Sequence, residues 1–348
     1  LNSIVRMVDL GRLELLQRRV ARLIDDRGYD VVLVHPCQIS QAPSLLYHLR
    51  TPSVYYCQEP PRGLYEPLIP RPYHRNSGYR RLANQLDGLN SAYRFAVRRC
   101  DWRNTRAAGL VLTNSRYTRA AVRRIYATNA RVHQLGVDTA MFRPLRAVRE
   151  PFVLSVGALK PEKGFDFLIA SLASLPPSER LPLALVSNFE VPGERQYLQQ
   201  LASDGGVEVT FNVGIADTGL IRLYNAAQLL TYAPVREPLG LAPLESLACE
   251  TPVVGIDEGG VRETVIHRQT GVLAGRDPFT FGEAMRLLLQ DAERQAEYGR
   301  QGRVRVQTEW NWDISTDQLE SALVEVAGGI ATRPTTPSLA HLPIDGQE

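Results

Sequence analysis

Residues 229–256 read LLTYAPVREPLGLAPLESLACETPVVGI and contain a short apolar run, a helical stretch and a second apolar run. Short apolar runs between turn signals are typical of buried parallel strands, here 229–232 and 252–256. The helix between them is predicted over 242–249, where Pro243 suits the first position because its missing N–H would be unpaired there. A strand, a helix and a parallel strand predict a layered α/β domain.

The same alternation continues on both sides of this unit. It predicts two doubly wound α/β domains, 1–145 and 150–312, joined by a proline-bearing, charged linker and facing each other across a cleft. A C-terminal helix is expected at 313–331, and the Pro-, Thr- and Ser-rich tail 332–348 is expected to be disordered. The other predicted strands are 31–34, 53–57, 109–113, 152–156, 183–186 and 207–211, and the other helices are 10–26, 79–102, 118–126 and 166–175.

The composition is that of a folded protein large enough for two domains. The chain has 348 residues, of which 44% are hydrophobic and 22% charged. No apolar run approaches the ~18 residues that a membrane-spanning helix needs. The sequence has no G-x-G-x-x-G at a strand end, no G-x-x-x-x-G-K-[ST] and no G-x-S-x-G. This argues against dehydrogenases, P-loop enzymes and hydrolases with a nucleophile elbow.

The cysteines and the start of the chain indicate the compartment. The four cysteines are scattered and fit neither a zinc site nor a disulfide framework, so free thiols in a reducing compartment are expected. The first residues show no secretory signal, which favours a cytoplasmic location. A D-x-D motif is missing as well, so we expect chemistry without a metal.

Charge divides the chain into a basic half and an acidic half. Residues 1–150 hold 25 basic and 11 acidic side chains, or +14, and residues 151–348 hold 15 and 26, or −11. A basic half fits an anionic partner, and arginines on a solvated face explain it equally well. Our hypothesis is peripheral binding to an anionic membrane, at the inner face of the cell membrane. The arginines that suggest it are Arg80, Arg81, Arg94, Arg98, Arg99, Arg103 and Arg106.

The loop and helix at 237–245 carry the first candidate site. Glu237 precedes the helix and Glu245 lies near its first turn. The free N–H groups and dipole of a helix N-terminus favour an anion such as a diphosphate. The two carboxylates can accept hydrogen bonds from the vicinal hydroxyls of a sugar and a ribose. Taken alone, Glu245 is better explained as an acidic residue that the helix dipole favours.

The loop at 156–164 is the second candidate, because Lys160 and Lys163 are the only lysines among 40 basic residues. A compact ammonium group suits a phosphate, although two surface lysines placed by chance remain the alternative. Gly259 and Gly260, after the strand at 252–256, allow a backbone to approach a ligand closely or merely form a tight turn.

These three stretches, in this order, resemble the nucleotide-binding domain of retaining glycosyltransferases of family 4, which have the GT-B fold of two Rossmann-like domains. Residues 237–245 match the family's E-x7-E signature, 157–164 match its G-R-x-x-x-x-K-G loop, and 259–263 match its G-G-x-x-E. Residues 113–115 and 136–138 look like the N-S and G-V-D segments that precede its linker. The likeness covers roughly 30–330.

The resemblance implies a role for each matching residue. Lys163, with Gly157 and Lys160 in the same loop, would bind the donor diphosphate, and Glu245 would hold the ribose hydroxyls. Glu237 would contact the donor sugar and, with Lys163, act in catalysis. Backbone groups that face the sugar would come from Leu239, Gly240 and Leu241.

Three departures from the family pattern stand out. Ala158 occupies the position of the family's arginine, for which Lys160 is the candidate substitute. After the strand at 53–57 the family often has a histidine, and this chain has Gln58 and Glu59, which would lie on the acceptor or sugar side. The family's first strand and its glycine-rich loop have no counterpart in the sequence, so the first domain is expected to be truncated at its start.

The sequence therefore predicts a metal-independent, cofactor-free retaining glycosyltransferase. It would move a hexose from a nucleotide diphosphate sugar to a glycan or lipid-linked acceptor in the synthesis of a cell-surface polysaccharide or glycolipid, without a nucleic-acid partner. The alternatives are a non-catalytic nucleotide-sugar-binding protein or an inactive fragment of such an enzyme, with an epimerase on the same fold matching less well.

Overall fold

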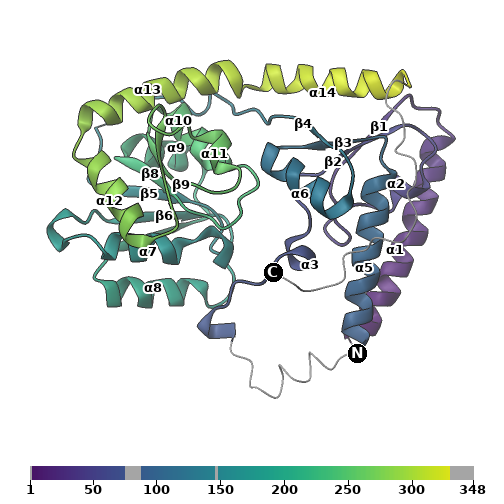
Figure 1. Cartoon of the computed structure of the whole chain (residues 1–348), viewed down its shortest axis with the longest axis horizontal. Coiled ribbons are helices and arrows are strands. Elements are labelled where there is room, and N and C mark those ends of the chain that lie inside the picture. Colours follow the sequence, from purple (N-terminus) through teal and green to yellow (C-terminus); the bar gives the residue numbers. More distant parts are fainter. Residues whose placement is uncertain (1, 75–87, 146–147, 330–348) are drawn as a thin grey trace.

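Two parallel sheets form the centres of two α/β domains in the computed structural model, which describes residues 2–74, 88–145 and 148–329 (Figure 1). The first sheet has the strand order β1-β2-β3-β4, and the second has the order β10-β9-β8-β5-β6-β7. Neighbouring strands within each sheet run parallel. Helices flank both sheets, and this confirms the fold class predicted from the alternation of strands and helices.

The first domain is built on a four-stranded parallel sheet. Its strands are β1 (Val32–Val34), β2 (Ser53–Tyr56), β3 (Leu110–Thr113) and β4 (Arg131–Val132). Its helices are α1 (Asn2–Asp25), α2 (Leu45–His48), α3 (Arg62–Tyr65), η1 (Pro72–His74), α5 (Gly88–Ala107) and α6 (Arg116–Tyr126). Apolar side chains of α1, α2 and α6 pack on one face of this sheet and form a core of their own.

The second domain contains the larger core, built on six strands. The strands are β5 (Val153–Val156), β6 (Leu183–Ser187), β7 (Val209–Val213), β8 (Leu229–Tyr232), β9 (Val253–Ile256) and β10 (Gly271–Ala274). The helices are η2 (Pro161–Lys163), α7 (Phe165–Ala173), η3 (Pro177–Glu179), α8 (Glu194–Gly205), α9 (Asp217–Ala226), α10 (Leu241–Ala248), α11 (Val261–Thr264), α12 (Pro278–Leu289), α13 (Ala292–Glu309) and α14 (Trp312–Ala327).

The strand order of the second sheet decides where a ligand can bind. β5 pairs with β6 on one side and with β8 on the other, so the order of the strands reverses between β5 and β8. In open α/β sheets, ligands bind outside the carboxyl ends of the strands at such a reversal. The loops that follow β5 and β8 carry the candidate lysines and Glu237, and Glu245 lies in the helix that follows the second loop.

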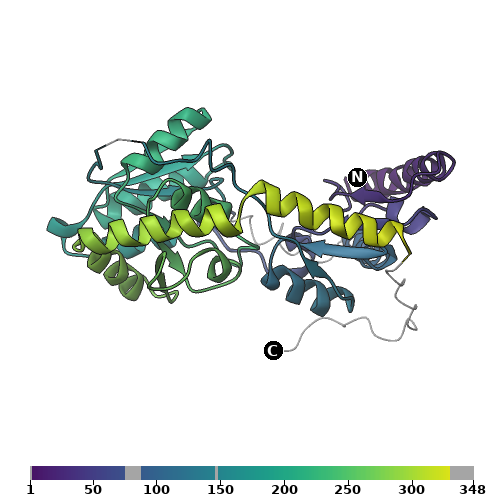
Figure 2. The same cartoon turned by 90° about the horizontal axis from the view of Figure 1, so that it is seen from above.

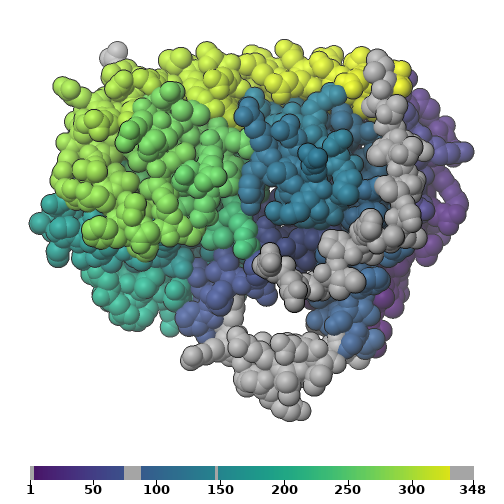
Figure 3. Space-filling view, viewed as in Figure 1, coloured from purple at the N-terminus to yellow at the C-terminus, as the bar shows by residue number. Residues whose placement is uncertain are grey.

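The C-terminal helices return the chain to the first domain. α13 lies on the second domain, and α14 continues from it across the first (Figure 2). Figure 3 shows the two helices covering one edge of both domains. Ala322 and Val326 of α14 pack against Val54, Tyr56 and Leu112 in the first sheet. The first domain is therefore covered on this face by α14.

Most predicted strands lie within two residues of the observed ones, and the helix ends differ more. The predicted helix 10–26 begins at Asn2, and the part of the predicted helix 79–102 that the structure describes belongs to α5, which begins at Gly88 and continues to Ala107. α14 ends at Ala327, before Gly328 and Gly329, instead of at 331. Residues 79–87 and the tail 332–348 lie outside the described residues.

The predicted boundary of the first domain at residue 145 is wrong for two segments. Val137 and Phe142 already pack in the core of the second domain, because the chain reaches this domain soon after β4. Arg71 also binds the second domain: its guanidinium group contacts Glu194 and Asp166. A part of the first half of the chain is thus built into the second domain.

Asp101 of α5 is a fully buried carboxyl group in the first domain. Tyr126 and Tyr65 donate their hydroxyls to its Oδ2 at 2.7 and 3.0 Å, and the N–H of Ala42 lies 3.3 Å from Oδ1. Burial raises the pKa of Asp101 to about 6, although these three hydrogen bonds act in the opposite direction. The folded protein therefore holds a proton at this site up to a higher pH than the unfolded chain does.

This carboxyl group should make the stability of the protein depend on pH in acid. Between the ordinary value of 3.8 and about 6, the folded state binds more protons, so its contribution to stability is lost as the pH rises. Asp101→Asn should remove this decline, which amounts to about 3 kcal/mol for a shift of about two units. Urea unfolding between pH 4 and 7 measures this decline in stability. Asp317→Asn, at an exposed residue of α14, is the control. Parallel profiles of Asp101→Asn and the native protein would contradict the assignment.

Candidate active site

A cavity of about 860 Å³ lies between the two domains at the carboxyl ends of β5 and β8. The first domain contributes polar side chains to its wall, among them Gln41, Gln58, Arg62 and Asn114. The second domain contributes the loops after β5 and β8 and the start of α10. The residues that the sequence proposed as donor-binding all line this one cavity: Gly157, Lys160, Lys163, Glu237, Leu239, Gly240, Leu241 and Glu245.

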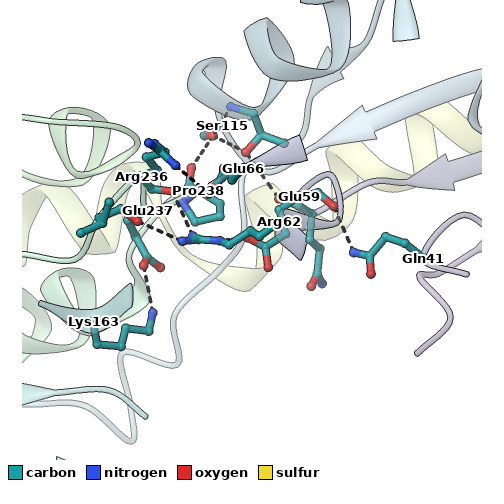
Figure 4. Close-up of polar contacts among 12 residues, drawn as sticks. Gln41, Glu59, Arg62, Glu66, Ser115, Lys163, Arg236, Glu237 and Pro238 are labelled. Carbon is teal, nitrogen blue, oxygen red and sulfur yellow. Dashed lines mark hydrogen bonds and ion pairs between the residues drawn. The ribbon is translucent and has the colours of Figure 1, made fainter. Parts of the chain in front are cut away.

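The loop after β5 turns sharply to bring Lys163 into the cavity. Gly164 follows it with a φ of +67°, and a Cβ there would lie 2.2 Å from the carbonyl oxygen of Ala233. Only glycine fits this close approach between the β5 and β8 loops. The Lys163 ammonium lies 2.9 Å from a carboxylate oxygen of Glu237, and the side chains are 26% and 12% exposed (Figure 4). The structure thus pairs the two residues predicted to be catalytic.

α10 begins at Leu241, and its N-terminus faces the cavity. Gly240 precedes it with a φ of +91°, which a glycine adopts without strain. The N–H groups of the first turn have no partner inside a helix, so they can donate to an anion. Pro243 is the third helical residue, two positions later than predicted, and its missing N–H still falls in this first turn.

Glu245 lies one turn into α10, where Tyr224 of α9 donates its hydroxyl to a carboxylate oxygen at 2.7 Å. Burial raises the pKa of Glu245, and the hydrogen bond from Tyr224 partly opposes this. Tyr224 itself is fully buried. Its fixed hydroxyl orients the carboxylate, which leaves the second oxygen of Glu245 for a ligand in the cavity.

Gly259 and Gly260 pack directly against the backbone of the Glu237 loop. A Cβ on Gly260 would lie 2.2 Å from the carbonyl oxygen of Pro238, and one on Gly259 would lie 2.6 Å from that of Glu237. The N–H of Gly260 donates to the Glu237 carbonyl at 2.8 Å. The paired glycines therefore support the loop from behind, and the close approach that they allow is to the protein's own backbone.

Glu263, the last residue of the same motif, lies at the other domain. Its carboxylate accepts the N–H groups of Arg116 and Tyr117, both at 2.9 Å, at the N-terminus of α6. An acidic side chain is favoured there by the helix dipole. This residue joins the two domains and does not line the cavity.

Lys160 lies at the wall of the cavity with its ammonium over the ring of Phe189, 4.8 Å from the ring centre. The structure therefore gives this lysine a cation–π partner and leaves its predicted contact with phosphate as a prediction. Lys163 has the more enclosed position of the two.

Gln58 and Glu59 follow β2 and lie on the first-domain side of the cavity. A carboxylate oxygen of Glu59 accepts the Nε of Arg62 at 2.8 Å, and its backbone carbonyl accepts the amide of Gln41. Glu59 is thus committed to protein contacts, and Gln58 is exposed. The role of either residue toward a sugar or acceptor remains a prediction.

Sequence analysis missed several residues at the site. Arg62, Gln41 and Asn114 line the cavity from the first domain, and Tyr224 and Tyr232 support its two glutamates. Arg62 follows Pro60 and Pro61 in the short segment between β2 and α3, and this position in the loop after a strand was the signal that could have found it. The tyrosines carried no such signal, because their roles depend on contacts made in the folded structure.

Some arginines of the proposed membrane surface have structural partners. Arg103 binds Glu14 of α1 and stacks on Tyr47, and Arg106 donates to the carbonyls of Tyr126 and Ala127. Arg80 and Arg81 lie outside the described residues. The surface of α5 is thus less free than the sequence suggested, and binding to a membrane stays a prediction.

Across the described ranges, no helix combines the length and apolarity needed to cross a bilayer. Within the same ranges no cluster of three or more histidine, cysteine, aspartate or glutamate side chains has the geometry of a metal site. Chemistry without a metal is still a prediction.

The sequence of the second domain matches a known family. Residues 137–305 match the family described as glycosyl transferases group 1. The GDP-mannose-dependent alpha-(1-6)-phosphatidylinositol monomannoside mannosyltransferase of Mycolicibacterium smegmatis is 31% identical over 322 residues, covering 82% of this chain and 81% of the relative. The mouse alpha-1,3/1,6-mannosyltransferase ALG2 is 24% identical and is covered over 64% of its length.

Solved structures agree with the fold. Anabaena Alr3699/HepE in complex with UDP-glucose superposes with a TM-score of 0.69 at 22% identity, over 91% of this chain and 84% of that protein. This likeness shows the GT-B arrangement of the two domains and nothing finer.

This chain spans less than two thirds of the length of some relatives. The match to mouse ALG2 spans 64% of that relative, and the match to a Mycobacterium tuberculosis relative spans 60% of it.

The family match covers α10, both glutamates and the lysine loop, which are the parts that build the wall of the cavity in the second domain. The mycobacterial relative extends the likeness through most of the chain at over 30% identity. Together with the two sheets and the cavity between them, these findings show that the chain belongs to the glycosyl transferases group 1.

Proposed function

We propose that this protein is a retaining glycosyltransferase that moves a hexose from a nucleotide diphosphate sugar to a glycan or lipid-linked acceptor. The diphosphate would lie at Lys163 and the N-terminus of α10, the ribose at Glu245, and the hexose at Glu237. The acceptor would enter from the first-domain side, past Gln58. The observation that carries the proposal is the pairing of Lys163 with Glu237 beside a free helix N-terminus in an interdomain cavity.

The electrostatics of the cavity suit the breaking of a glycosidic bond. As the bond between the anomeric carbon and the diphosphate breaks, both electrons go to the diphosphate oxygen, and negative charge grows there. Lys163 and the N–H groups of α10 would stabilise this charge more in the transition state than in the bound donor. The acceptor oxygen would bond to the anomeric carbon from the same face and pass its proton to the leaving diphosphate.

The donor is best sought among GDP-mannose and UDP-glucose. The mycobacterial relatives are named as GDP-mannose-dependent mannosyltransferases, and Alr3699/HepE was solved with UDP-glucose. We favour mannose, because the mannosyltransferases match this chain at higher identity. Synthesis of a cell-surface polysaccharide or glycolipid at the inner face of the membrane would use such a reaction, without metal or cofactor.

A protein that binds nucleotide sugar without transferring it would use the same cavity. Product analysis separates the two: glycosyl transfer to an added acceptor mixture or slow hydrolysis of the donor supports the enzyme. Binding of donor without turnover supports the binding protein or inactive fragment.

Calorimetry with GDP and UDP tests the donor site before any acceptor is known. The tighter nucleotide should lose about 10-fold or more in affinity in its 2′,3′-dideoxy form, because hydrogen bonds to a carboxylate contribute about 1.5–3 kcal/mol. Glu245→Gln should weaken the ordinary nucleotide and abolish the difference between the two forms. Glu258→Gln, a matched substitution at a residue paired with Arg276, should change neither. If Glu245→Gln keeps the full difference, the ribose does not lie at Glu245.

A further inference from the structure

The loop that carries Glu237 is held along its backbone by an unbroken series of hydrogen bonds. Four consecutive carbonyl oxygens, those of residues 235–238, each accept a hydrogen bond. Three of the four donors come from the first domain (Figure 4). The fourth is the N–H of Gly260, in the second domain. The other domain thus fixes a loop that belongs to the donor half of the cavity.

Arg62 makes two of these contacts. Its Nη1 donates to the carbonyl of Val235 and its Nη2 to that of Arg236, both at 2.9 Å. Its Nε donates to Glu59 at 2.8 Å, which holds the guanidinium plane in position. A planar guanidinium with all three nitrogens engaged is a rigid support, because its donors have a fixed geometry.

Ser115 makes the third contact. This residue precedes α6. Its hydroxyl accepts a hydrogen bond from the N–H of Thr118 at 2.9 Å and donates one to the carbonyl of Pro238 at 2.5 Å. Its side chain is fully buried, so it touches no substrate. Glu263 binds the next two N–H groups of the same helix terminus from the second domain. The start of α6 is therefore docked beside the loop at two points.

The loop needs such support because its own conformation is strained. Arg236 has a φ of +52°, which costs free energy for a residue with a Cβ. Its side chain also reaches Glu66 of the first domain, 3.6 Å away. A loop held by contacts from outside adopts a conformation that it would not hold alone.

We propose that Arg62 and Ser115 are positioning residues that orient Glu237 toward the donor sugar only while the two domains are docked. The inference deepens the proposed function and rests on it for the identity of the sugar. Neither residue acts on a reacting atom; both act through the carbonyl groups on either side of Glu237. Binding of the nucleotide part alone depends on the second domain and stays independent of them.

Amide hydrogen exchange of the peptide covering 233–241 tests the support directly, in the whole chain and without any substrate. Arg62→Met and Ser115→Ala should each speed exchange about 10-fold, and Ser115→Thr, which keeps the hydroxyl, should restore the native rate. Arg106→Met is the matched control, because Arg106 also donates to two consecutive carbonyls but inside the first domain. It should leave the peptide unchanged. Native exchange in both Arg62→Met and Ser115→Ala would overturn the proposal.

The second readout separates positioning from general damage. In the native protein, the affinity gained by adding the sugar is the ratio of the dissociation constants of UDP to UDP-glucose, or of GDP to GDP-mannose. Both variants should bind the nucleotide within about 2-fold of the native protein and lose most of this gain, as Glu237→Gln should also do. If a variant shows faster exchange but gains as much affinity from the sugar as the native protein does, its residue does not orient Glu237. If the native protein binds neither nucleotide, the result counts against the proposed function. The exchange experiment would still decide whether Arg62 and Ser115 hold the loop.

Discussion

Replacing Lys163 with methionine should lower the kcat of sugar transfer by about 100- to 1000-fold, the usual cost of removing one charged or hydrogen-bonding group that stabilises a transition state. The Lys163 ammonium lies in the cavity beside Glu237 at 2.9 Å, near the first turn of α10. Methionine keeps a similar length and removes the charge. Because the effect falls on the growing charge of the diphosphate, KM for the donor should change less than kcat.

The other lysine of the chain is the matched control for this experiment. Lys160 lies three residues earlier in the same loop, and its ammonium rests on the ring of Phe189. Lys160→Met should lower kcat much less than Lys163→Met does, because the Lys160 ammonium rests on the Phe189 ring and does not pair with Glu237. Steady-state kinetics with either donor distinguish the two lysines. Equal losses in both variants would show that the cavity is filled differently from the proposed arrangement.

Arg71→Met should lower the free energy of unfolding by about 3–5 kcal/mol, because it leaves a buried carboxylate without its partner. Arg71 and Glu194 are 4% and 0% exposed, and Nε and Nη2 of Arg71 lie 3.2 Å from the two carboxylate oxygens. Asp166 binds the same guanidinium at 2.9 Å, and the Tyr73 hydroxyl donates to Glu194. Once the charge is gone, both acids must be protonated or hydrated at the expense of stability.

A double substitution and an exposed pair test the cause. Arg71→Met with Glu194→Gln should recover part of the loss, because the stranded charge is removed with its partner. Arg50→Met breaks a pair with Asp25 in which the arginine is 81% exposed, so its cost should stay below about 1 kcal/mol. Urea unfolding followed by circular dichroism measures all three. A loss in Arg71→Met no larger than in Arg50→Met would contradict the buried pair.

The sequence was sufficient for eight of the ten observed strands and for the residues that line the cavity at the loops after β5 and β8; β4 and β10 were not predicted. Buried parallel strands are short unbroken apolar runs, so their positions follow from the order of residues alone. Lys163 and Glu237 are far apart in sequence, yet both follow strands that flank the reversal of strand order, and the topology brings them together. Local pattern and sheet topology carry this information.

The contacts between the domains could not be predicted in the same way. Arg62 binds carbonyls 173 and 174 residues away, and Arg71 binds a carboxylate 123 residues away. The sequence counts both arginines in its basic half, but it does not show their partners, because the partner of an arginine depends on packing. Ser115 belongs to the N-S segment of the family pattern, but its hydroxyl also donates to the Pro238 carbonyl, and no local pattern predicts that contact.

The return of α14 to the first domain limits how this protein can be recombined with its relatives. Exchanging donor specificity between relatives by transplanting the continuous segment 150–312 would keep the native α14, but its Ala322 and Val326 would have to reach the first sheet from a foreign α13. Arg71 lies outside this segment and would come from the recipient. The transplanted segment would therefore need carboxylates that pair with it, as Asp166 and Glu194 do here. A working chimera therefore has to take three separate pieces from one parent: the segment 150–312, α14 and the segment that carries Arg71. The smallest part of this fold that can be exchanged is thus larger than either domain.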